Sequence, residues 1–305
     1  MREINENRKL TEIEGRQHTV VRGWRRALHL ENLPWLLWVF DFLLSVVMLK
    51  QIGKRNALET EVKEVEIELA NLPEVFDGVR ILFVSDIHLG EGVKEIAGII
   101  AENTCGMEYD YCILGGDYNF EHEEPDEFLE KGLGSIVSSL LEKSRVFGVL
   151  GNHDRFKTAE VLDGFGVEML MNDSVRIERE GASLYIAGID DCHYYNAGDI
   201  GLACEKIEPG GCRIMVSHTP EPYHGVEEAG FDLCLCGHTH GGQVCLPGGV
   251  PLVANTTVPR RFLKGRWHYK QLQGYTSCGV GASGVAVRFF CRPEITVLTL
   301  QKKEL

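Results

Sequence analysis

Five short apolar segments of this sequence each end in side chains that could bind a metal ion. These side chains are carboxylates, imidazoles and one amide: Asp86, His88, Asp117, Asn152, His218, His238 and His240. Oxygen and imidazole donors of this kind suit Zn, Fe or Mn. Seven donors are too many for one tetrahedral ion, so the set predicts two divalent cations that share a bridging carboxylate.

The spacing of the donors supports a single site. Asp86 and His88 form an Asp-x-His pair, and His238 and His240 form a His-x-His pair. Alternate side chains of an extended segment point the same way, so both members of a pair would face the site. Glycines beside the donors, such as Gly237, allow close backbone approach and positive φ. One histidine alone is more often structural, but five groups in order, each behind an apolar run, favour a functional site.

The apolar segments themselves predict an α/β protein. Continuous apolar runs at 80–85, 111–114 and 146–150 predict strands buried on both faces, and helical patterns at 92–103 and 126–142 separate them. This βαβαβ order is typical of a layered α/β fold. Ligand sites in such folds form beyond the carboxyl ends of strands, which is where the donors stand.

The rest of the chain adds further strands. Glutamates alternate with apolar residues over 64–69, which predicts a half-buried strand. After residue 160 the sequence becomes richer in strands, with short apolar runs at 175–177, 184–187, 214–217 and 233–236. Residues 274–300 are expected to hold several short strands separated by glycines.

The donor set resembles that of the calcineurin-like metallophosphoesterases. The motifs that carry the resemblance are Asp86-x-His88, Gly116-Asp117, Gly151-Asn-His-Asp154, Ser217-His218 and Gly237-His-Thr-His240. The likeness spans about residues 62–300 and is strongest to a bacterial, membrane-associated branch of the superfamily. It implies a four-layer α/β fold in which two mixed β-sheets form a sandwich flanked by helices.

The resemblance also implies roles for the donors. The residues implied for one metal are Asp86, His88 and His240. Those implied for the other are Asn152, His218 and His238, with Asp117 as the bridge between the metals. Two such cations lower the pKa of a shared water, and the resulting hydroxide would attack phosphorus in line with the leaving oxygen. His153 would stand near the leaving group as proton donor or electrostatic stabiliser, and Asp154 would support the ligands or cap a turn.

One position departs from the family pattern. The family commonly has a second Asp three residues after the bridging one, which orients and charges the catalytic histidine. Phe120 stands there in this sequence, and the spacing leaves open whether Glu121, His122 or Glu123 substitutes for the missing carboxylate. Without that carboxylate His153 would be a weaker acid, which disfavours alkyl phosphate monoesters and favours better leaving groups, as in pyrophosphate cleavage.

Composition excludes several classes of protein. The chain has 305 residues, of which 44% are hydrophobic and 25% charged, an ordinary globular profile. A formal net charge of -14 argues against nucleic-acid binding. Ten cysteines without a C-x-x-C pair favour buried free thiols in a reducing cytosol over disulfides or a Cys-rich zinc site. A basic cluster of Arg260, Arg261, Lys264 and Arg266 could meet a substrate phosphate or an anionic lipid, or be a solvated loop.

The sequence divides into an N-terminal segment, 1–58, and a metallophosphoesterase domain, 59–305. The first contains the most apolar run of the chain, 33–49, which is short for a membrane span and has Asp41 at its centre. Basic flanks and two tryptophans favour an apolar helix in the membrane interface over a core helix or a docking helix for a partner. Whether it spans, lies on or never meets a membrane stays open. We expect a cytoplasmic protein, peripheral on the inner membrane face; the alternatives are a single membrane anchor or export.

The expected substrate is phosphorylated and lipid-linked. Some members of the superfamily hydrolyse UDP-2,3-diacylglucosamine in lipid A synthesis, and an apolar N-terminal helix is consistent with that role. The alternative is a broad phosphodiesterase or phosphatase acting on nucleotides or cell-envelope phosphates. A third hypothesis, a membrane-tethered scaffold that kept the fold and lost catalysis, is disfavoured by the complete set of seven donors.

Overall fold

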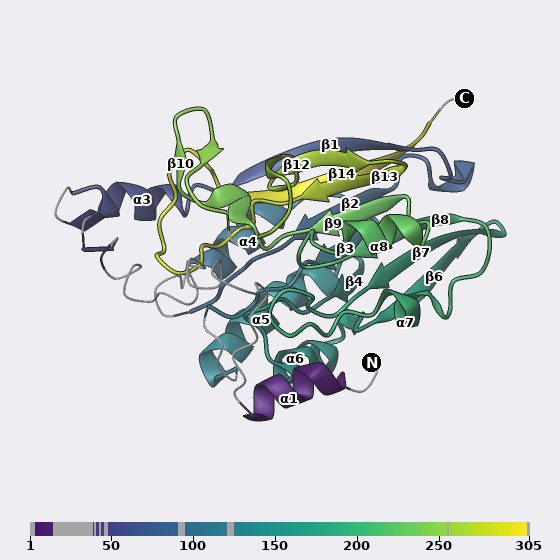
Figure 1. Ribbon diagram of the computed structural model, residues 1–305, viewed down its shortest axis with the longest axis horizontal. Helices are drawn as coiled ribbons and strands as arrows, with labels where there is room; N and C mark the ends of the chain where they lie inside the picture. Colours follow the sequence, from purple (N-terminus) through teal and green to yellow (C-terminus); the bar gives the residue numbers. More distant parts are fainter. Residues whose placement is uncertain are drawn as a thin grey trace.

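Two six-stranded β-sheets lie against each other and carry helices on their outer faces (Figure 1). The computed structural model describes residues 4–14, 39, 41–42, 44–45, 48–90, 95–120, 125–254 and 256–303. The strand order is β1-β14-β2-β3-β4-β5 in the first sheet and β12-β13-β9-β8-β7-β6 in the second. Both sheets mix parallel and antiparallel pairs, so the predicted four-layer α/β sandwich is confirmed.

The first sheet contains the strands that the apolar runs predicted. Its members are β1 (Glu61–Leu69), β14 (Glu294–Lys302), β2 (Arg80–Val84), β3 (Tyr111–Leu114), β4 (Arg145–Gly148) and β5 (Glu168–Met169). From β2 to β5 the strands run parallel, whereas β14 is antiparallel to β2 and parallel to β1. Because β2, β3 and β4 are parallel, their carboxyl ends reach the same edge of the sheet.

The second sheet brings two more strand ends to that edge. Its members are β12 (Gly265–Tyr269), β13 (Leu272–Thr276), β9 (Leu233–Cys236), β8 (Cys212–Val216), β7 (Ala182–Gly188) and β6 (Asp173–Arg179). The strands β13, β9, β8 and β7 are parallel, and the two edge strands are antiparallel to their neighbours. A separate hairpin is formed by β10 (Cys245–Leu246) and β11 (Val250–Pro251).

The expectation of several short strands over 274–300 was wrong. In the described part of that range β13 ends at Thr276 and β14 begins at Glu294, with loops between them. The reason is that backbone N–H groups of this segment bond to the loop after β2 instead of to a strand: Val280 donates to Ser85 O and Gly281 to Asp86 O. The glycine-rich segment therefore braces the β2 loop from outside.

Helices cover the outer face of each sheet. On the first sheet these are α4 (Ile96–Thr104), α5 (Glu127–Leu141) and α6 (Phe156–Phe165), which share a core cluster with it. On the second they are α7 (Ile200–Cys204) and α8 (Tyr223–Glu228). Asp126 caps α5 by accepting a hydrogen bond from Leu129 N at 2.8 Å. The strands of the first sheet are apolar on both faces because helices cover one face and the second sheet covers the other.

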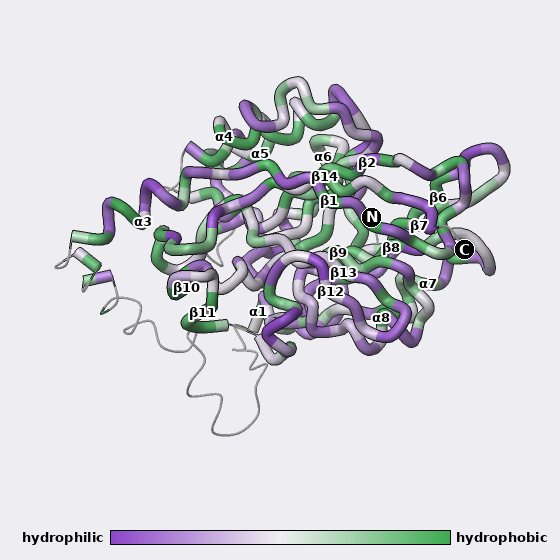
Figure 2. Tube along the Cα trace, turned by 90° about the horizontal axis from the view of Figure 1, so that it is seen from above, coloured by the Kyte–Doolittle hydropathy of each residue, from purple (hydrophilic) through white to green (hydrophobic). Residues whose placement is uncertain are grey.

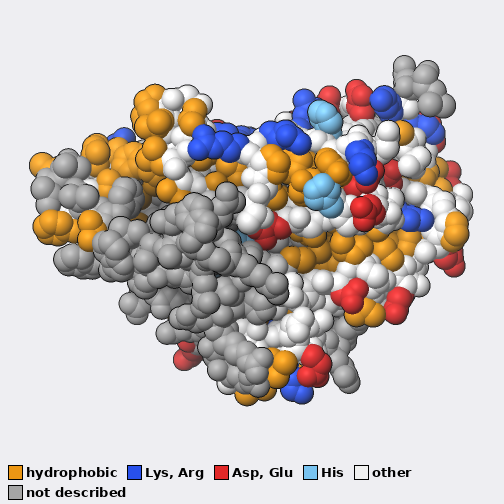
Figure 3. Space-filling model, viewed as in Figure 1, with side chains coloured by type: hydrophobic (Ala, Val, Ile, Leu, Met, Phe, Trp, Pro, Cys, Tyr) orange, Lys and Arg blue, Asp and Glu red, His pale blue; other side chains and the backbone are white. Residues whose placement is uncertain are grey.

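Two helices of the N-terminal segment are described, α1 (Glu6–Glu14) and α3 (Lys50–Asn56). Most of the predicted apolar helix over 33–49 lies outside the described residues, so it stays a prediction, as does the division at residue 58. Among the residues that the structure describes, no helix has the length and apolar character needed to cross a bilayer. In two views at right angles α3 lies at the same end of the molecule as the β10–β11 hairpin (Figures 1 and 2). Hydrophobic side chains are exposed over that end (Figure 3).

Candidate metal centre

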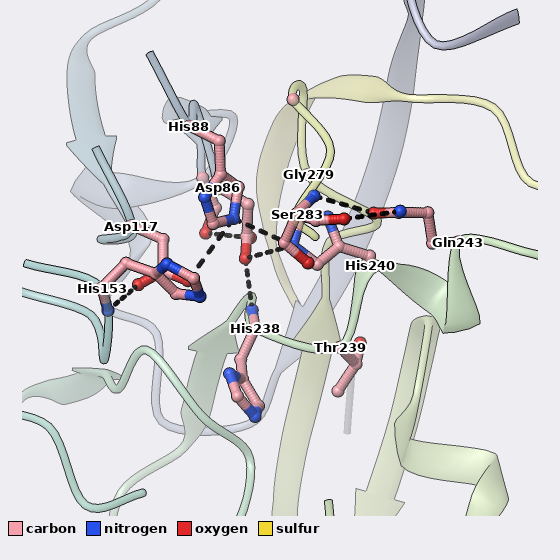
Figure 4. Close-up of polar contacts among 12 residues, drawn as sticks. Asp86, His88, Asp117, His153, His238, Thr239, His240, Gln243, Gly279 and Ser283 are labelled. Atoms are coloured by element: carbon pink, nitrogen blue, oxygen red, sulfur yellow. Dashed lines mark hydrogen bonds and ion pairs between the residues drawn. The ribbon is translucent and has the colours of Figure 1, made fainter. Parts of the chain in front are cut away.

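The side chains singled out in the sequence come together where the carboxyl ends of the strands meet (Figure 4). Each stands directly after a strand: Asp86 and His88 after β2, Asp117 after β3, Asn152 and His153 after β4, His218 after β8, and His238 and His240 after β9. The seven predicted ligands are buried, and His153 is half-buried. Residues up to 154 positions apart in the sequence therefore form one polar cluster.

The predicted ligand atoms fall into two groups, and a further group joins His88 and Asp117 to His153. Asp86, His88 and His240 each offer one ligand atom, and these atoms lie within 4.8 Å of one another. Within this group His88 Nε2 is 3.0 Å from His240 Nε2, which is 3.5 Å from Asp86 Oδ1. Asp117, His218 and His238 form a second group by the same measure.

Asp117 lies between the two groups. Its Oδ2 is 3.2 Å from His218 Nε2 and 3.5 Å from His88 Nε2. Asn152 joins the second group, because its Oδ1 is 2.8 Å from His238 Nδ1 and 3.2 Å from His218 Nε2. One carboxylate thus faces both groups, as a bridging ligand must, and the arrangement is capable of holding two metals.

Hydrogen bonds on the far side of two imidazoles show that the residues fit divalent cations. His88 Nδ1 lies 3.0 Å from Asn119 O, and His218 Nδ1 lies 2.8 Å from Gly115 O. A carbonyl oxygen only accepts, so Nδ1 carries the proton in each neutral ring and Nε2 presents a lone pair to the other ligand atoms. In addition, Asn152 Nδ2 is buried with no hydrogen-bond partner among the described residues, while its oxygen faces the cluster. Lone pairs directed at one another in this way are stabilised by a cation between them.

The electrostatics of the cluster also favour cations. Burial opposes a charge on His218, yet the Asp117 carboxylate raises the pKa of His218 to about 10. Burial likewise opposes ionisation of Asp117, but His218 and His153 hold its pKa well below the usual value. Burial lowers the pKa of His88 to about 3, which keeps that imidazole neutral and able to ligate. The Asp117 carboxylate therefore stabilises positive charge beside it, and a divalent cation there would take the place of a proton on His218.

The ligands are held by strained backbone. Asp86, His88, Asp117, His238 and His240 all have positive φ, between 47° and 68°. Residues other than glycine rarely adopt this left-handed backbone conformation, and backbone strain of this kind is common at functional sites. The sequence predicted positive φ for glycines near the site, but it gave no sign that the ligands themselves would adopt it.

The comparison with known proteins decides the family. Residues 79–242 match the family described as calcineurin-like phosphoesterase, a range that covers more than half of the chain and includes both groups of ligands. The chain belongs to this family. As a calcineurin-like phosphoesterase it is a metal-dependent hydrolase of phosphoric esters, as the resemblance predicted.

The sequence similarity to known proteins covers most of the chain. Phosphodiesterase YaeI of Escherichia coli is 30% identical over 244 residues, which cover 72% of this chain and 82% of that protein. The uncharacterized metallophosphoesterase YkoQ of Bacillus subtilis is 27% identical over 271 residues, covering 85% of this chain and 98% of that one. Among solved structures, the calcineurin-like phosphoesterase YfkN of Bacillus subtilis superposes with a TM-score of 0.42 and 13% identity, over 66% of this chain and 81% of that chain.

The structure answers what supports His153 in this phosphoesterase. His153 Nδ1 lies 3.0 Å from the backbone oxygen of Phe120, the residue that replaces the family's second Asp. Its backbone N–H donates to Asp117 Oδ1 at 2.9 Å, so the Asp117 carboxylate also fixes the loop that carries His153. The substitutes considered at 121–123 lie outside the described residues. Among the described residues, the backbone carbonyl of Phe120 is therefore a group that orients the imidazole.

Asp154 ties two loops of the site together. Its carboxylate accepts backbone hydrogen bonds from Asp117 N at 2.7 Å, Gly151 N and Tyr118 N at 2.8 Å, and Asn119 N at 3.1 Å. Four donors hold the loop after β3 against the loop after β4 and so set the position of Asp117. Gly151 is required at this crossing, because a Cβ there would come within 2.1 Å of Asp117 Oδ1.

Another histidine beside the site was missed in the sequence. His193, in the loop after β7, is buried, and its ring centroid lies 4.2 Å from that of His238. His193 Nδ1 is 3.1 Å from Glu221 Oε2. The preceding Asp191 accepts backbone N–H bonds from residues 193–195, which makes it a turn-forming residue here. No spacing in the sequence connects His193 to His238, because the contact joins loops of different strands.

The sequence also gave no indication that α1 belongs to the site. Arg8 is fully buried and forms an ion pair with Asp190, with 2.5 Å between Nη2 and Oδ1. Its Nη1 donates to the backbone oxygen of Asp154 at 2.7 Å, and its guanidinium stacks 3.8 Å from the centroid of the Tyr195 ring. Arg8 therefore clamps the loop of Asp154 to the loop of Asp190 from outside the metal centre.

Replacing Arg8 with methionine is expected to destabilise the fold by about 3–5 kcal/mol, because the Asp190 carboxylate would remain buried without its partner. Thermal and urea unfolding of the purified protein measure this loss. Lys9→Met, at the neighbouring exposed position, serves as the control and should change stability little. The double variant Arg8→Met with Asp190→Leu should recover most of the loss, and equal losses in the single and double variants would contradict the clamp.

Proposed function

We propose that this protein cleaves a pyrophosphate bond in a lipid-linked phosphorylated substrate such as UDP-2,3-diacylglucosamine. The coarser activity, metal-dependent phosphoester hydrolysis, follows from its family. The proposed metals are two divalent cations, Mn, Fe or Zn. In this assignment Asp86, His88 and His240 hold one metal and Asn152, His218 and His238 the other, with Asp117 between them.

In this proposal, Asp117 and Asp154 position the metal-binding groups, and His153 handles the proton at the leaving oxygen. Two cations at this site would supply a water of lowered pKa and neutralise charge on the phosphoryl oxygens. Asp117 fixes the distance between the two ligand groups, and Asp154 fixes Asp117 through four backbone amides. His153 Nδ1 donates to Phe120 O, so Nε2 is the ring atom that would hold or give a proton at the leaving oxygen.

The observation that carries the choice of bond is the carbonyl behind His153. A carboxylate partner would stabilise the imidazolium by ion pairing, whereas the Phe120 carbonyl offers a hydrogen bond without charge. Alkoxide leaving groups depend on a proton from this histidine and leave slowly without it. A phosphate leaving group needs little protonation, so the site favours pyrophosphate bonds over alkyl monoesters.

Lipid linkage and membrane association are supported by sequence and surface. The apolar run 33–49 carries basic flanks and tryptophans, a composition suited to a membrane interface. All ten cysteines are free thiols, which agrees with the reducing side of the membrane. We therefore place the protein on the cytoplasmic face of the inner membrane, with lipid A synthesis as the process and no nucleic-acid partner.

The second candidate is a broad phosphodiesterase or phosphatase acting on nucleotides or cell-envelope phosphates. The specific observation in its favour is the similarity to a protein named phosphodiesterase, YaeI.

An activity panel separates the two candidates. Purified enzyme with added Mn is expected to hydrolyse UDP-2,3-diacylglucosamine in detergent roughly 10²-fold faster, by kcat/KM, than alkyl phosphate monoesters, because a phosphate leaving group needs less protonation than an alkoxide. Product masses show which P–O bond breaks. Bis(p-nitrophenyl) phosphate provides the soluble diester for comparison. Equal rates on the lipid-linked pyrophosphate and on soluble nucleotide diesters would favour the broad phosphodiesterase, and fast cleavage of alkyl monoesters would overturn the leaving-group argument.

A further inference from the structure

The end of the molecule that carries α3 and the β10–β11 hairpin exposes apolar side chains on three separate segments. We call this surface the hairpin face and define its apolar part by Ile52, Leu246, Val250, Leu252, Val253 and Phe290. Phe290 is 62% exposed, Leu252 52% and Leu246 50%. Scattered single residues of this kind are ordinary, but a contiguous apolar patch marks an interaction site.

Backbone contacts join these segments into one surface. In α3, Gly53 O accepts from Arg288 N at 2.9 Å, and Asn56 donates to Arg288 O. The same loop is joined to the hairpin, because Cys245 N donates to Phe289 O at 2.9 Å. Ile52 and Phe290 therefore lie beside the hairpin in a fixed arrangement.

The charge around the hairpin face is opposite to that of the chain. Between Asp232 and Glu294 the sequence has no Asp or Glu, although the average of 45 in 305 would put about nine there. The same stretch contains seven cations: Arg260, Arg261, Lys264, Arg266, Lys270, Arg288 and Arg292. Arg288 is buried, and Lys270 and Arg292 pair with Glu227 and Glu59, so the surface charge comes from the first four. Lys264 donates to Gly249 O in the hairpin turn, and the exposed Arg260 and Arg261 stand on η6 (Arg260–Phe262). Figure 3 shows Lys and Arg side chains next to the hydrophobic surface at this end of the molecule.

We propose that the hairpin face docks the protein on an anionic lipid bilayer, with the hairpin and Phe290 in the interface and the η6 cations on headgroup phosphates. Apolar side chains on a projecting hairpin, bordered by cations of one sign, suit a membrane surface. A second copy fits less well, because an isologous dimer would bring two cationic borders together. The inference deepens the membrane association proposed above and assigns it a surface that the apolar run 33–49 does not contain.

Docking in this orientation would present the metal centre to lipid-linked substrate. Thr239, between His238 and His240, donates to Leu263 O, which directly precedes Lys264. On the other side, Cys291 Sγ donates to His240 O at 3.3 Å, and Cys291 follows Phe290. The face and the ligands therefore belong to the same loops, and a phosphate held at the membrane surface would lie beside the centre.

Vesicle flotation of the full, metal-loaded chain tests the proposal. The probes are vesicles of phosphatidylcholine alone and of phosphatidylcholine mixed with phosphatidylglycerol. Leu246→Ser with Leu252→Ser is expected to weaken binding to the mixed vesicles about tenfold. Arg260→Gln with Arg261→Gln should also weaken it about tenfold, and added salt should remove that difference. Binding to phosphatidylcholine alone should be weak for every variant.

The control variants replace apolar and cationic side chains that are exposed outside the hairpin face. Ile13→Ser removes an exposed apolar side chain from α1, and Lys131→Gln with Lys157→Gln removes two exposed cations from α5 and α6. Both should bind as the wild type does. Hydrolysis of bis(p-nitrophenyl) phosphate reports folding, and if the serine variant fails there, the arginine variant decides the outcome.

Each of the other possible outcomes overturns a particular part of the docking proposal. Wild-type binding by both hairpin-face variants would overturn this face and leave the apolar run 33–49 as the membrane contact. No vesicle binding by the wild type would overturn the face and the membrane association together, while the hydrolytic activity is measured separately on the soluble diester. A change from dimer to monomer in the serine variant, by sedimentation velocity, with unchanged vesicle binding would assign the face to a second copy.

Discussion

Replacing Asp117 with asparagine is expected to lower kcat/KM on bis(p-nitrophenyl) phosphate by about 10³-fold or more and to reduce bound metal. The side chain faces both ligand groups, with Oδ2 at 3.2 Å from His218 Nε2 and 3.5 Å from His88 Nε2. Asparagine keeps the size of the side chain but removes its charge and one acceptor. Both groups would therefore lose the anion that they share.

Metal analysis distinguishes this role from a structural one. The amide should still accept from His153 N, so the fold should persist, while the metal content of protein purified without chelator falls below that of the wild type. Asp163→Asn, an exposed position on α6, is the matched control and should keep both metal and activity. Full activity with two bound metals in Asp117→Asn would remove Asp117 from the bridging role.

The strands and the ligands could be predicted because each depends on local sequence. A run such as 111–114 is apolar on both faces because its sheet is covered on both sides. When neighbouring strands of this kind are parallel, their carboxyl ends lie at one edge of the sheet. Donors that follow such runs are brought together by topology alone. The resemblance to the family, rather than topology, implied that Asp86 and His240, 154 positions apart, share one metal, and the structure places their ligand atoms in one group.

The remaining parts of the site depend on contacts that local sequence does not encode. The carbonyl that supports His153 belongs to Phe120, and every residue has such a carbonyl, so no side-chain pattern marks it. Arg8 lies in a polar stretch that reads as a solvated helix, yet it is buried because Asp190 and the carbonyl of Asp154 meet there. Segment 277–293 was misread because its glycines suggested turns between strands, whereas its amides bond to the β2 loop.

Hydrogen bonds connect the Arg8 ion pair to the candidate metal centre. Arg8 holds the backbone of Asp154, whose carboxylate holds the amides of Asp117 and its neighbours. Asp117 in turn accepts from the backbone of His153. A continuous series of hydrogen bonds thus runs from α1 to His153, which is the support that a preorganised site needs.

Replacing His153 with alanine is expected to change activity in proportion to how much the leaving group needs a proton. Diesters with alkyl leaving groups should lose about 10²-fold in kcat/KM, whereas p-nitrophenyl and pyrophosphate substrates should lose less than about tenfold. The slope of log kcat/KM against leaving-group pKa should therefore become steeper in the variant. Metal content should stay that of the wild type, because the variant keeps all seven predicted ligands.

The same series separates proton donation from simple electrostatic stabilisation. If His153 only stabilises charge on the phosphoryl group, its loss lowers kcat/KM for all substrates by the same factor. The slope of log kcat/KM against leaving-group pKa then stays unchanged. His268→Ala, at an exposed position on β12, is the control and should leave both slope and rate as they are. A steeper slope assigns the proton to His153 Nε2, the ring atom opposite the Nδ1 that faces the Phe120 carbonyl.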